Sequence, residues 1–166
     1  MSPSPKPLHS RVDLACEQLE VAIELFVSEK SDVSALTLAG AAEEILGVEL
    51  KNRGLENALQ KHYAARERLL DSAERSMFPP KVKMKRRTWK AHTIQENSAR
   101  NAAKHIADRK ASSHEYDEFF RADPRSAAGT MISRALLNQR NLSLPVSAAG
   151  ERFERWYFFH VRGMLE

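Results

Sequence analysis

The chain has 166 residues, of which 42% are apolar and 29% are charged, so a single compact domain with its own core is expected. No apolar run approaches the roughly 18 residues that a membrane-spanning helix needs, and residues 1–10 lack the apolar segment of a signal peptide. We therefore expect a cytoplasmic protein without a membrane partner. The single cysteine, Cys16, excludes an internal disulfide and a Cys-x-x-Cys metal or redox pair.

The net charge of +4 has a local origin. Six basic residues and no acidic residue occur between positions 81 and 90, which leaves 20 basic and 22 acidic residues elsewhere, a net charge of −2. One basic patch favours a polyanionic partner that contacts the protein at one place.

Apolar residues recur at helical spacing through most of the chain. Residues 1–8 contain three prolines and are expected to form a disordered tail, and residues 9–166 a single domain. A first helix is expected from about Ser10 to Phe26, and a second from a cap at Ser31 to a stop at Gly47. Gly40 lies inside this second helix, which suggests close helix packing at that position.

The second half of the chain continues the helical pattern. A third helix is expected after Gly54, from Leu55 toward residues 79 and 80, and a fourth from about Thr88 to Ile106. Residues 107–122 are expected to form a loop, after which Asp123 and Pro124 are typical of a helix start. A last helix carries an aromatic cluster at 153–159. No segment has the period-two pattern of a strand, so the sequence predicts an all-α up-and-down bundle of about five to six helices.

Several common chemistries lack their residues. The chain has no Gly-rich phosphate loop, no His-Glu-x-x-His motif and no Glu-x-x-His pair, so no metal site and no cofactor are expected. Glu43 and Glu44 are adjacent on a predicted helix and point about 100° apart, which favours a solvated face or a local salt bridge over a convergent site.

Residues 98–109 (SARNAAKHIADR) combine groups suited to phosphodiester chemistry. Asn101 and His105 share a helix face, with Lys104 beside them and Arg100 at the flank. An imidazole can take a proton from a ribose 2′-hydroxyl, and a guanidinium can bind two phosphate oxygens. Such a site needs no metal.

The string RNAAKH, residues 100–105, resembles the R-x4-6-H motif of the HEPN superfamily (higher eukaryote and prokaryote nucleotide-binding domains). Residues 37–46 (TLAGAAEEIL) are also similar to a segment of small bacterial proteins that carry an RN-x-x-KH string. The resemblance implies a helical bundle that commonly dimerises, and in many members cleaves RNA without metal. It implies that Arg100, Asn101 and His105 form the catalytic site, with Arg100 on the phosphate and His105 on the 2′-hydroxyl.

The R-x4-H spacing alone is not specific, since three other Arg and His pairs in the chain share it: Arg87 with His92, Arg109 with His114, and Arg155 with His160. The asparagine after Arg100 distinguishes the fourth pair. Arg100 and His105 lie about 140° apart around one helix. One copy of the motif can therefore bind a phosphate only if the helix frays near His105 or a second protomer completes the site, and we expect a homodimer. The alternative is that Arg100 pairs with an acidic side chain and nothing is cleaved.

Residues outside the motif have two interpretations. The basic segment can guide RNA, and we name as candidate RNA-binding residues Lys85, Arg86, Arg87, Trp89, Lys90 and Lys104. The favoured alternative is a solvated loop with Trp89 packed at the start of a helix. The C-terminal aromatic residues favour core or interface over base stacking; His62 and His160 are expected to be structural, and Cys16 inert.

Two functions remain open. One is a metal-independent endoribonuclease of HEPN type, a toxin or defence component with a possible antitoxin or other protein partner. The other is a non-catalytic HEPN-like module that binds RNA, nucleotide or protein.

Overall fold

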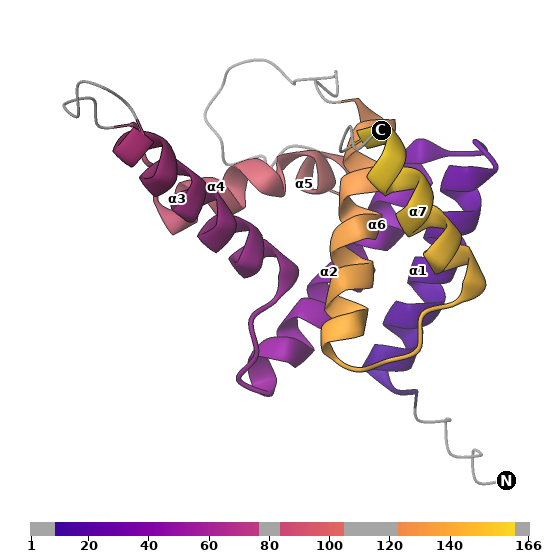
Figure 1. The fold of residues 1–166 in the computed structure, drawn as a ribbon. Helices are drawn as coiled ribbons and strands as arrows, with labels where there is room; N and C mark the ends of the chain where they lie inside the picture. The colour runs from indigo at the N-terminus through magenta and orange to yellow at the C-terminus, as the bar shows by residue number, and fades with distance from the viewer. Residues whose placement is uncertain (1–8, 77–83, 105–122, 162–166) are drawn as a thin grey trace, which may run out of the picture.

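The computed structural model describes residues 9–76, 84–104 and 123–161. The described residues form seven helices and no strand (Figure 1), which confirms the all-α prediction with one or two helices more than expected. The helices are α1 (Arg11–Val27), α2 (Asp32–Asn52), α3 (Ala58–Ser76), α4 (Trp89–Glu96), α5 (Ser98–Lys104), α6 (Pro124–Asn141) and α7 (Ala148–Val161). No helix in these ranges is long and apolar enough to cross a membrane.

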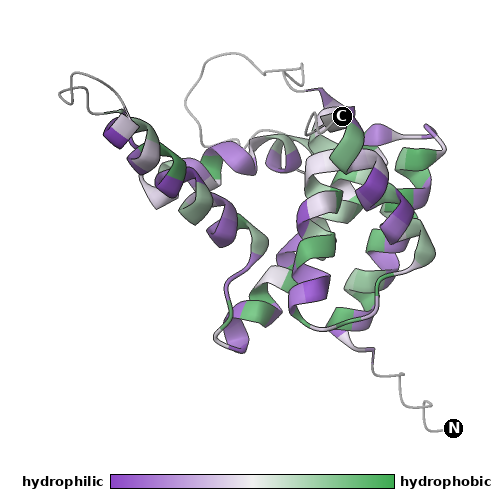
Figure 2. Cartoon of the chain, viewed as in Figure 1, coloured by the Kyte–Doolittle hydropathy of each residue, from purple (hydrophilic) through white to green (hydrophobic). Residues whose placement is uncertain are grey.

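The core lies where α2 packs against α1 and α6, and α7 covers one side of this group (Figure 1). Its largest fully buried side chains are Leu19, Ile23, Phe26, Leu36, Leu46, Leu50, Met131, Ile132, Leu136 and Phe153. Polar residues alternate with these apolar positions along each helix (Figure 2), as the helical periodicity predicts. α2 is therefore the central helix of the bundle.

Helix starts follow the predicted capping residues. Ser10 accepts a hydrogen bond from the backbone N–H of Asp13, and Ser31 accepts one from Ser34. Asp123 accepts two, from the N–H groups of Arg125 and Ser126, immediately before α6. These side chains satisfy N–H groups that have no partner within the first turn of a helix.

The prediction that the second helix stops at Gly47 is wrong, because α2 continues to Asn52. Gly47 is buried, and a Cβ there would meet the side-chain amides of Asn57 and Asn138 at 3.4 Å. Leu50, one turn later, is fully buried in the core. Burial of this last turn outweighs the roughly 1 kcal/mol that a mid-helix glycine costs.

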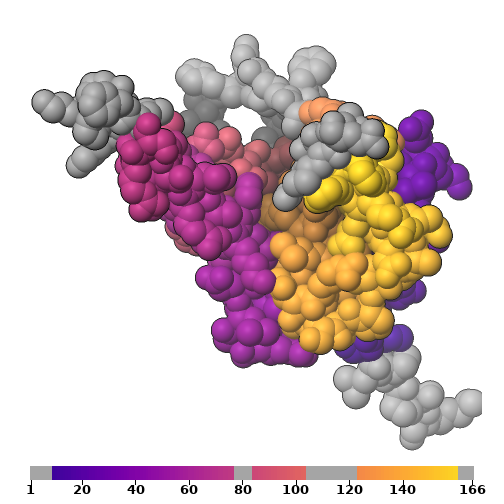
Figure 3. All heavy atoms as spheres, in the orientation of Figure 1, coloured from indigo at the N-terminus to yellow at the C-terminus, as the bar shows by residue number. Residues whose placement is uncertain are grey.

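The third helix begins at Ala58, three residues later than predicted. Asn57 caps it, since its side-chain oxygen accepts from the N–H of Gln60 while the Gln60 side chain accepts from the N–H of Asn57. α3 projects from the bundle (Figure 3), and its buried residues are Ala58 and Leu59. Leu69, an apolar residue in the middle of α3, is 71% exposed, so the later turns of this helix do not join the core.

The predicted fourth helix is two helices, α4 and α5, separated at Asn97. The side chain of Asn97 is buried and accepts a hydrogen bond from Arg134, which places the helix break at a polar contact with α6. The helical spacing of Ile94 and Ala102 suggests a buried stripe on this segment, but both residues are exposed. The predicted tail 1–8, the predicted loop 107–122, and Ile106 lie outside the described residues.

The side chain of Asn138 connects three helices, its own helix α6 and the helices α2 and α3. It is fully buried; its side-chain oxygen accepts from the N–H of Ala58 at 2.7 Å, and its amide nitrogen donates to the carbonyl of Glu43 at 3.2 Å. One side chain therefore satisfies the first turn of α3 and fixes it against α2 and α6.

We expect Asn138→Ala to lower the free energy of unfolding by about 2–4 kcal/mol, because it leaves the buried N–H of Ala58 without its partner and removes the hydrogen bond to the carbonyl of Glu43. Urea denaturation followed by circular dichroism measures the change. Asn52→Ala, at an exposed position at the end of α2, is the matched control and should stay within about 0.5 kcal/mol of the wild type. Equal stabilities for the two variants would contradict this role of Asn138.

Candidate functional site

Arg100 of α5 crosses α2 at Gly40. A Cβ on Gly40 would lie 2.5 Å from both Cγ and Cδ of Arg100, a separation that no side chain tolerates without movement. Gly40 thus provides the space for the aliphatic part of Arg100. The close packing predicted for Gly40 is confirmed, with an arginine side chain as the group that uses the space.

The guanidinium of Arg100 is surrounded by acceptors from two helices. Its Nη1 lies 3.4 Å from Oε2 of Glu43 and 3.6 Å from Oε2 of Glu44, and its Nε and Nη2 contact Oδ1 of Asn101 at 3.4 and 3.3 Å. The side chain of Arg100 is 11% exposed. The cation is therefore covered and paired with carboxylates.

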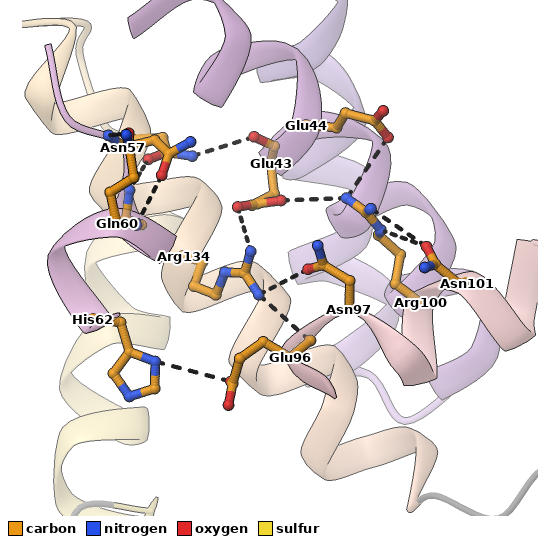
Figure 4. A network of polar contacts seen from close by, with 12 residues as sticks. Glu43, Glu44, Asn57, Gln60, His62, Glu96, Asn97, Arg100, Asn101 and Arg134 are labelled. Carbon is orange, nitrogen blue, oxygen red and sulfur yellow. Dashed lines mark hydrogen bonds and ion pairs between the residues drawn. The ribbon is translucent and has the colours of Figure 1, made fainter. Parts of the chain in front are cut away.

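A second arginine completes the cluster from α6. Nη2 of Arg134 donates to Oε1 of Glu43 at 2.6 Å, and Nη1 donates to Oδ1 of Asn97 at 3.2 Å. Glu43, Asn97, Arg100 and Arg134 are called the Glu43 network (Figure 4). Each carboxylate oxygen of Glu43 thus faces a different guanidinium, and the network connects α2, α4, α5 and α6.

Burial makes the Glu43 network structurally important. The side chains of Glu43 and Arg134 are 5% and 8% exposed, and a buried charge is tolerated when it is paired and hydrogen-bonded. Removing one member of such a pair typically costs about 3–5 kcal/mol, because the remaining charge stays buried without compensation.

The expectation that Glu43 and Glu44 do not converge is wrong: both carboxylates reach the same guanidinium nitrogen of Arg100.

A hollow of about 250 Å³ lies over this network. Carboxylates of Glu43 and Glu44 line it together with Arg100, Lys51 and the ring of Trp89. Its charged groups have both signs, so it is not a dedicated anion pocket. A larger hollow of about 670 Å³ lies between α1 and α7, away from the predicted residues.

The described part of the basic segment is divided between paired and unpaired cations. Arg86 contacts the carboxylates of Glu67, Asp71 and Glu74 on α3 at 2.5–3.1 Å, and its hydrogen bond with Asp71 is the main cause of a raised Arg86 pKa. The pKa of Glu74 is lowered, mainly because its carboxylate accepts from the backbone N–H of Met84. Arg86 therefore fastens the segment to α3, and three carboxylates lie beside its guanidinium. That Arg86 binds RNA stays a prediction.

The other described cations of this segment remain in solvent. Lys85, Arg87 and Lys90 are exposed, and none of the three forms an ion pair with another described residue. Trp89 is the first residue of α4, packs edge-to-face on Tyr63 at 5.4 Å, and is still 38% exposed. The predicted packing of Trp89 at the helix start is confirmed, and one part of its ring remains accessible.

Of the three predicted catalytic residues, the structure describes Arg100 and Asn101 but not His105. Arg100 and Asn101 contact each other, as reported above, whereas His105 lies outside the described residues, as does the side chain of Lys104. The two arginines and Glu43 could not be joined from the sequence, since Arg134 is 91 positions from Glu43. Gly40 and Glu43 lie three residues apart on one face of α2, and this pairing of a small residue with an acidic one was the feature of the sequence that could have indicated a packed basic side chain.

Other predicted residues are structural. Phe153 is buried and contacts Phe26 edge-to-face at 5.4 Å, so the aromatic cluster contributes to the core, although Phe158 and Phe159 are exposed. His160 stacks on Trp156 at 5.0 Å and contacts its carbonyl. Burial raises the pKa of the Cys16 thiol, which agrees with an inert thiol.

Comparison of the chain with family models, with curated proteins and with solved structures gave no significant match. The resemblance to the HEPN superfamily therefore stays a prediction that rests on the residues quoted for it.

Gly40→Ala should lower stability in the wild-type background, because overpacking against Arg100 costs about 1–3 kcal/mol and helix propensity returns about 1 kcal/mol. In an Arg100→Ala background the same substitution should be neutral or stabilising, because the space is then free. Denaturant unfolding of the four proteins in this cycle measures the coupling.

Gly47→Ala is the control for helix propensity, since its Cβ would make contacts no closer than 3.4 Å. It should be neutral or stabilising in both backgrounds. If Gly40→Ala changes the free energy of unfolding equally with and without the Arg100 side chain, the space at Gly40 is not required by Arg100.

Proposed function

We propose that the chain is a HEPN-like module that binds single-stranded RNA without cleaving it, and that Arg100 is a structural residue of that module. The observation that carries this proposal is the covered guanidinium of Arg100, which faces Glu43 and Glu44 at 3.4 and 3.6 Å and is 11% exposed. A catalytic arginine must reach a phosphate with its donors. Here Nη1 faces two carboxylates, and Nε and Nη2 face the side-chain oxygen of Asn101.

Electrostatics near Arg100 oppose a phosphodiester. Glu43 and Glu44 both contribute negative charge where a phosphate oxygen would approach Arg100, and like charges within a few ångströms repel strongly in a partly desolvated site. Binding of phosphate by Arg100 would require the guanidinium to leave a buried carboxylate, which is costly. The alternative that Arg100 pairs with an acidic residue thus has direct support.

RNA binding is supported by the surface formed by Lys85, Arg87, Trp89 and Lys90. It combines three exposed cations with a partly exposed aromatic ring. Cations that follow a sugar–phosphate backbone and a ring on which a base stacks are the usual components of single-strand binding. Lys51, also exposed, lines the hollow beside Trp89 and extends this surface toward α2.

A metal-independent ribonuclease is the second candidate, and the contact between Arg100 and Asn101 favours it. Asn101 is exposed and holds the guanidinium of Arg100 through its side-chain oxygen, so the first two motif residues act as a pair. In this candidate a homodimer brings two motifs together, and His105 is the proton-transfer residue. A protein partner such as an antitoxin would regulate it.

Fluorescence anisotropy with a labelled single-stranded RNA tests binding. The triple variant Lys85→Gln, Arg87→Gln and Lys90→Gln should bind roughly tenfold or more weakly, and its salt dependence should fall by about two units of slope, because three phosphate contacts are removed. Trp89→Ala should weaken binding by a smaller factor that does not depend on salt.

The matched control removes three exposed cations from another part of the molecule: Lys30→Gln, Arg152→Gln and Arg155→Gln. This variant has the same net charge as the first and should retain most of the affinity and the slope. Equal losses in the two triple variants would mean that net charge alone determines binding, against the proposed surface.

Incubation of mixed RNA with the purified protein in EDTA decides between binding and cleavage. The proposal expects intact RNA for the wild type and for His105→Ala. RNA cleaved by the wild type and left intact by His105→Ala would support the ribonuclease instead.

A further inference from the structure

His92 of α4 is a buried histidine without a hydrogen-bond partner. Its side chain is 0% exposed, and neither Nδ1 nor Nε2 forms a hydrogen bond with any described residue. A buried polar group without a partner costs about 1–3 kcal/mol, so a fully buried imidazole with two unused nitrogens requires an explanation.

Two further ligating side chains lie around His92. Oε1 of Glu96 is 4.0 Å from Nδ1 of His92, and Oε2 of Glu96 is 3.9 Å from Nδ1 of His62 on α3. The two imidazole rings are 5.5 Å apart, and one ligand atom from each of the three residues lies within 4.8 Å of the others. Figure 4 shows His62 directed at Glu96 across the space between α3 and α4.

These separations are too long for hydrogen bonds and close to those of a metal site. In a tetrahedral zinc site with bonds of 2.0–2.1 Å, the ligand atoms are about 3.3 Å apart. Small rotations of His62, whose side chain is 53% exposed, and of Glu96 would close the difference. We propose that His62, His92 and Glu96 bind one divalent ion of the zinc type, with water at the fourth position.

The donor set selects this class of ion. Two neutral imidazoles and one carboxylate suit zinc and its neighbours in the transition series, whereas calcium and magnesium prefer oxygen ligands alone. Three protein ligands and one water are also the arrangement of known zinc sites with an open position.

Two nearby arginines are paired with carboxylates other than that of Glu96. Arg66 donates to Glu67 at 2.7 Å, and Arg134 donates to Glu43 at 2.6 Å. Glu96 keeps both carboxylate oxygens directed at the two histidines, because its contact with Arg134 is through the backbone carbonyl. The negative charge of Glu96 is thus available to the ion.

An ion at this position would also fasten α3 to α4. α3 has only two buried residues among those described, Ala58 and Leu59 near its start, so apolar packing holds its later turns weakly. A bond from His62 to an ion shared with α4 would supply a fixed contact there. This cluster contains no Glu-x-x-His pair, since Glu96 follows His92 by four residues and His62 belongs to another helix.

Titration of the metal-free full chain with Co²⁺, followed by its visible absorption, tests the proposal, with Zn²⁺ displacing Co²⁺ as confirmation. One ion per chain is expected for the wild type. His62→Ala and Glu96→Gln should each weaken binding at least roughly tenfold, since loss of even an outer partner of a metal ligand costs that much. Both positions are accessible enough for the variants to fold.

His160→Ala and Glu17→Gln are the matched controls, because they remove the same groups at exposed positions on α7 and α1. Both should bind like the wild type. Zn²⁺ should raise the melting temperature of the wild type and the controls and leave that of His62→Ala and Glu96→Gln unchanged.

No saturable Co²⁺ binding by the wild type would overturn the proposal. Equal binding by the wild type, His62→Ala and Glu96→Gln would overturn it as well, because the ion would then be held by other residues. The proposed RNA surface plays no part in this test, so either proposal can fail without the other.

Discussion

The carboxylate of Glu43 lies inside the bundle with a guanidinium on each of its two oxygens, and this contact joins α2 to α5 and α6. Arg134 contacts the carboxylate from α6, and Arg100 contacts it from α5. The backbone carbonyl of Glu43 accepts from Asn138, whose side-chain oxygen accepts from the first N–H of α3. The side chain and the carbonyl of this one residue therefore link α2 with α5 and α6 and, through Asn138, with α3. Buried charge of this kind needs compensation from each side, which fixes the partners in place.

The same contact determines what the molecule can do chemically. A guanidinium that neutralises Glu43 and also contacts Glu44 has few donors left for a phosphate. The motif that resembles a ribonuclease site thus contains an arginine used for packing and ion pairing. Cations with no described anionic partner occur at Lys85, Arg87 and Lys90, and for this reason the proposed RNA surface includes these residues and Trp89 but not Arg100.

Local signals in the sequence predicted local structure well. Ser10, Ser31 and Asp123 cap helices because their side chains satisfy the first backbone N–H groups, an effect confined to three or four residues. The predicted helix bounds are wrong where contacts with residues distant in sequence determine them. α2 continues through Gly47 because Leu50 is buried against other helices. The predicted fourth helix is interrupted at Asn97, where this residue contacts Arg134. The Glu43 network and the two histidines of α3 and α4 join residues far apart in the chain, and no short pattern encodes such contacts.

The central claim is that Arg100 remains bound to Glu43 while the protein holds RNA. Nitrogen-15 NMR of the arginine side chains, with Arg100 assigned from the spectrum of Arg100→Lys, tests it directly. The account predicts a slowly exchanging Arg100 Nε–H signal in the free protein that keeps its position at saturating RNA, while the Arg87 signal moves. An Arg100 signal that shifts on RNA addition would contradict the account and place the phosphate at the Glu43 network.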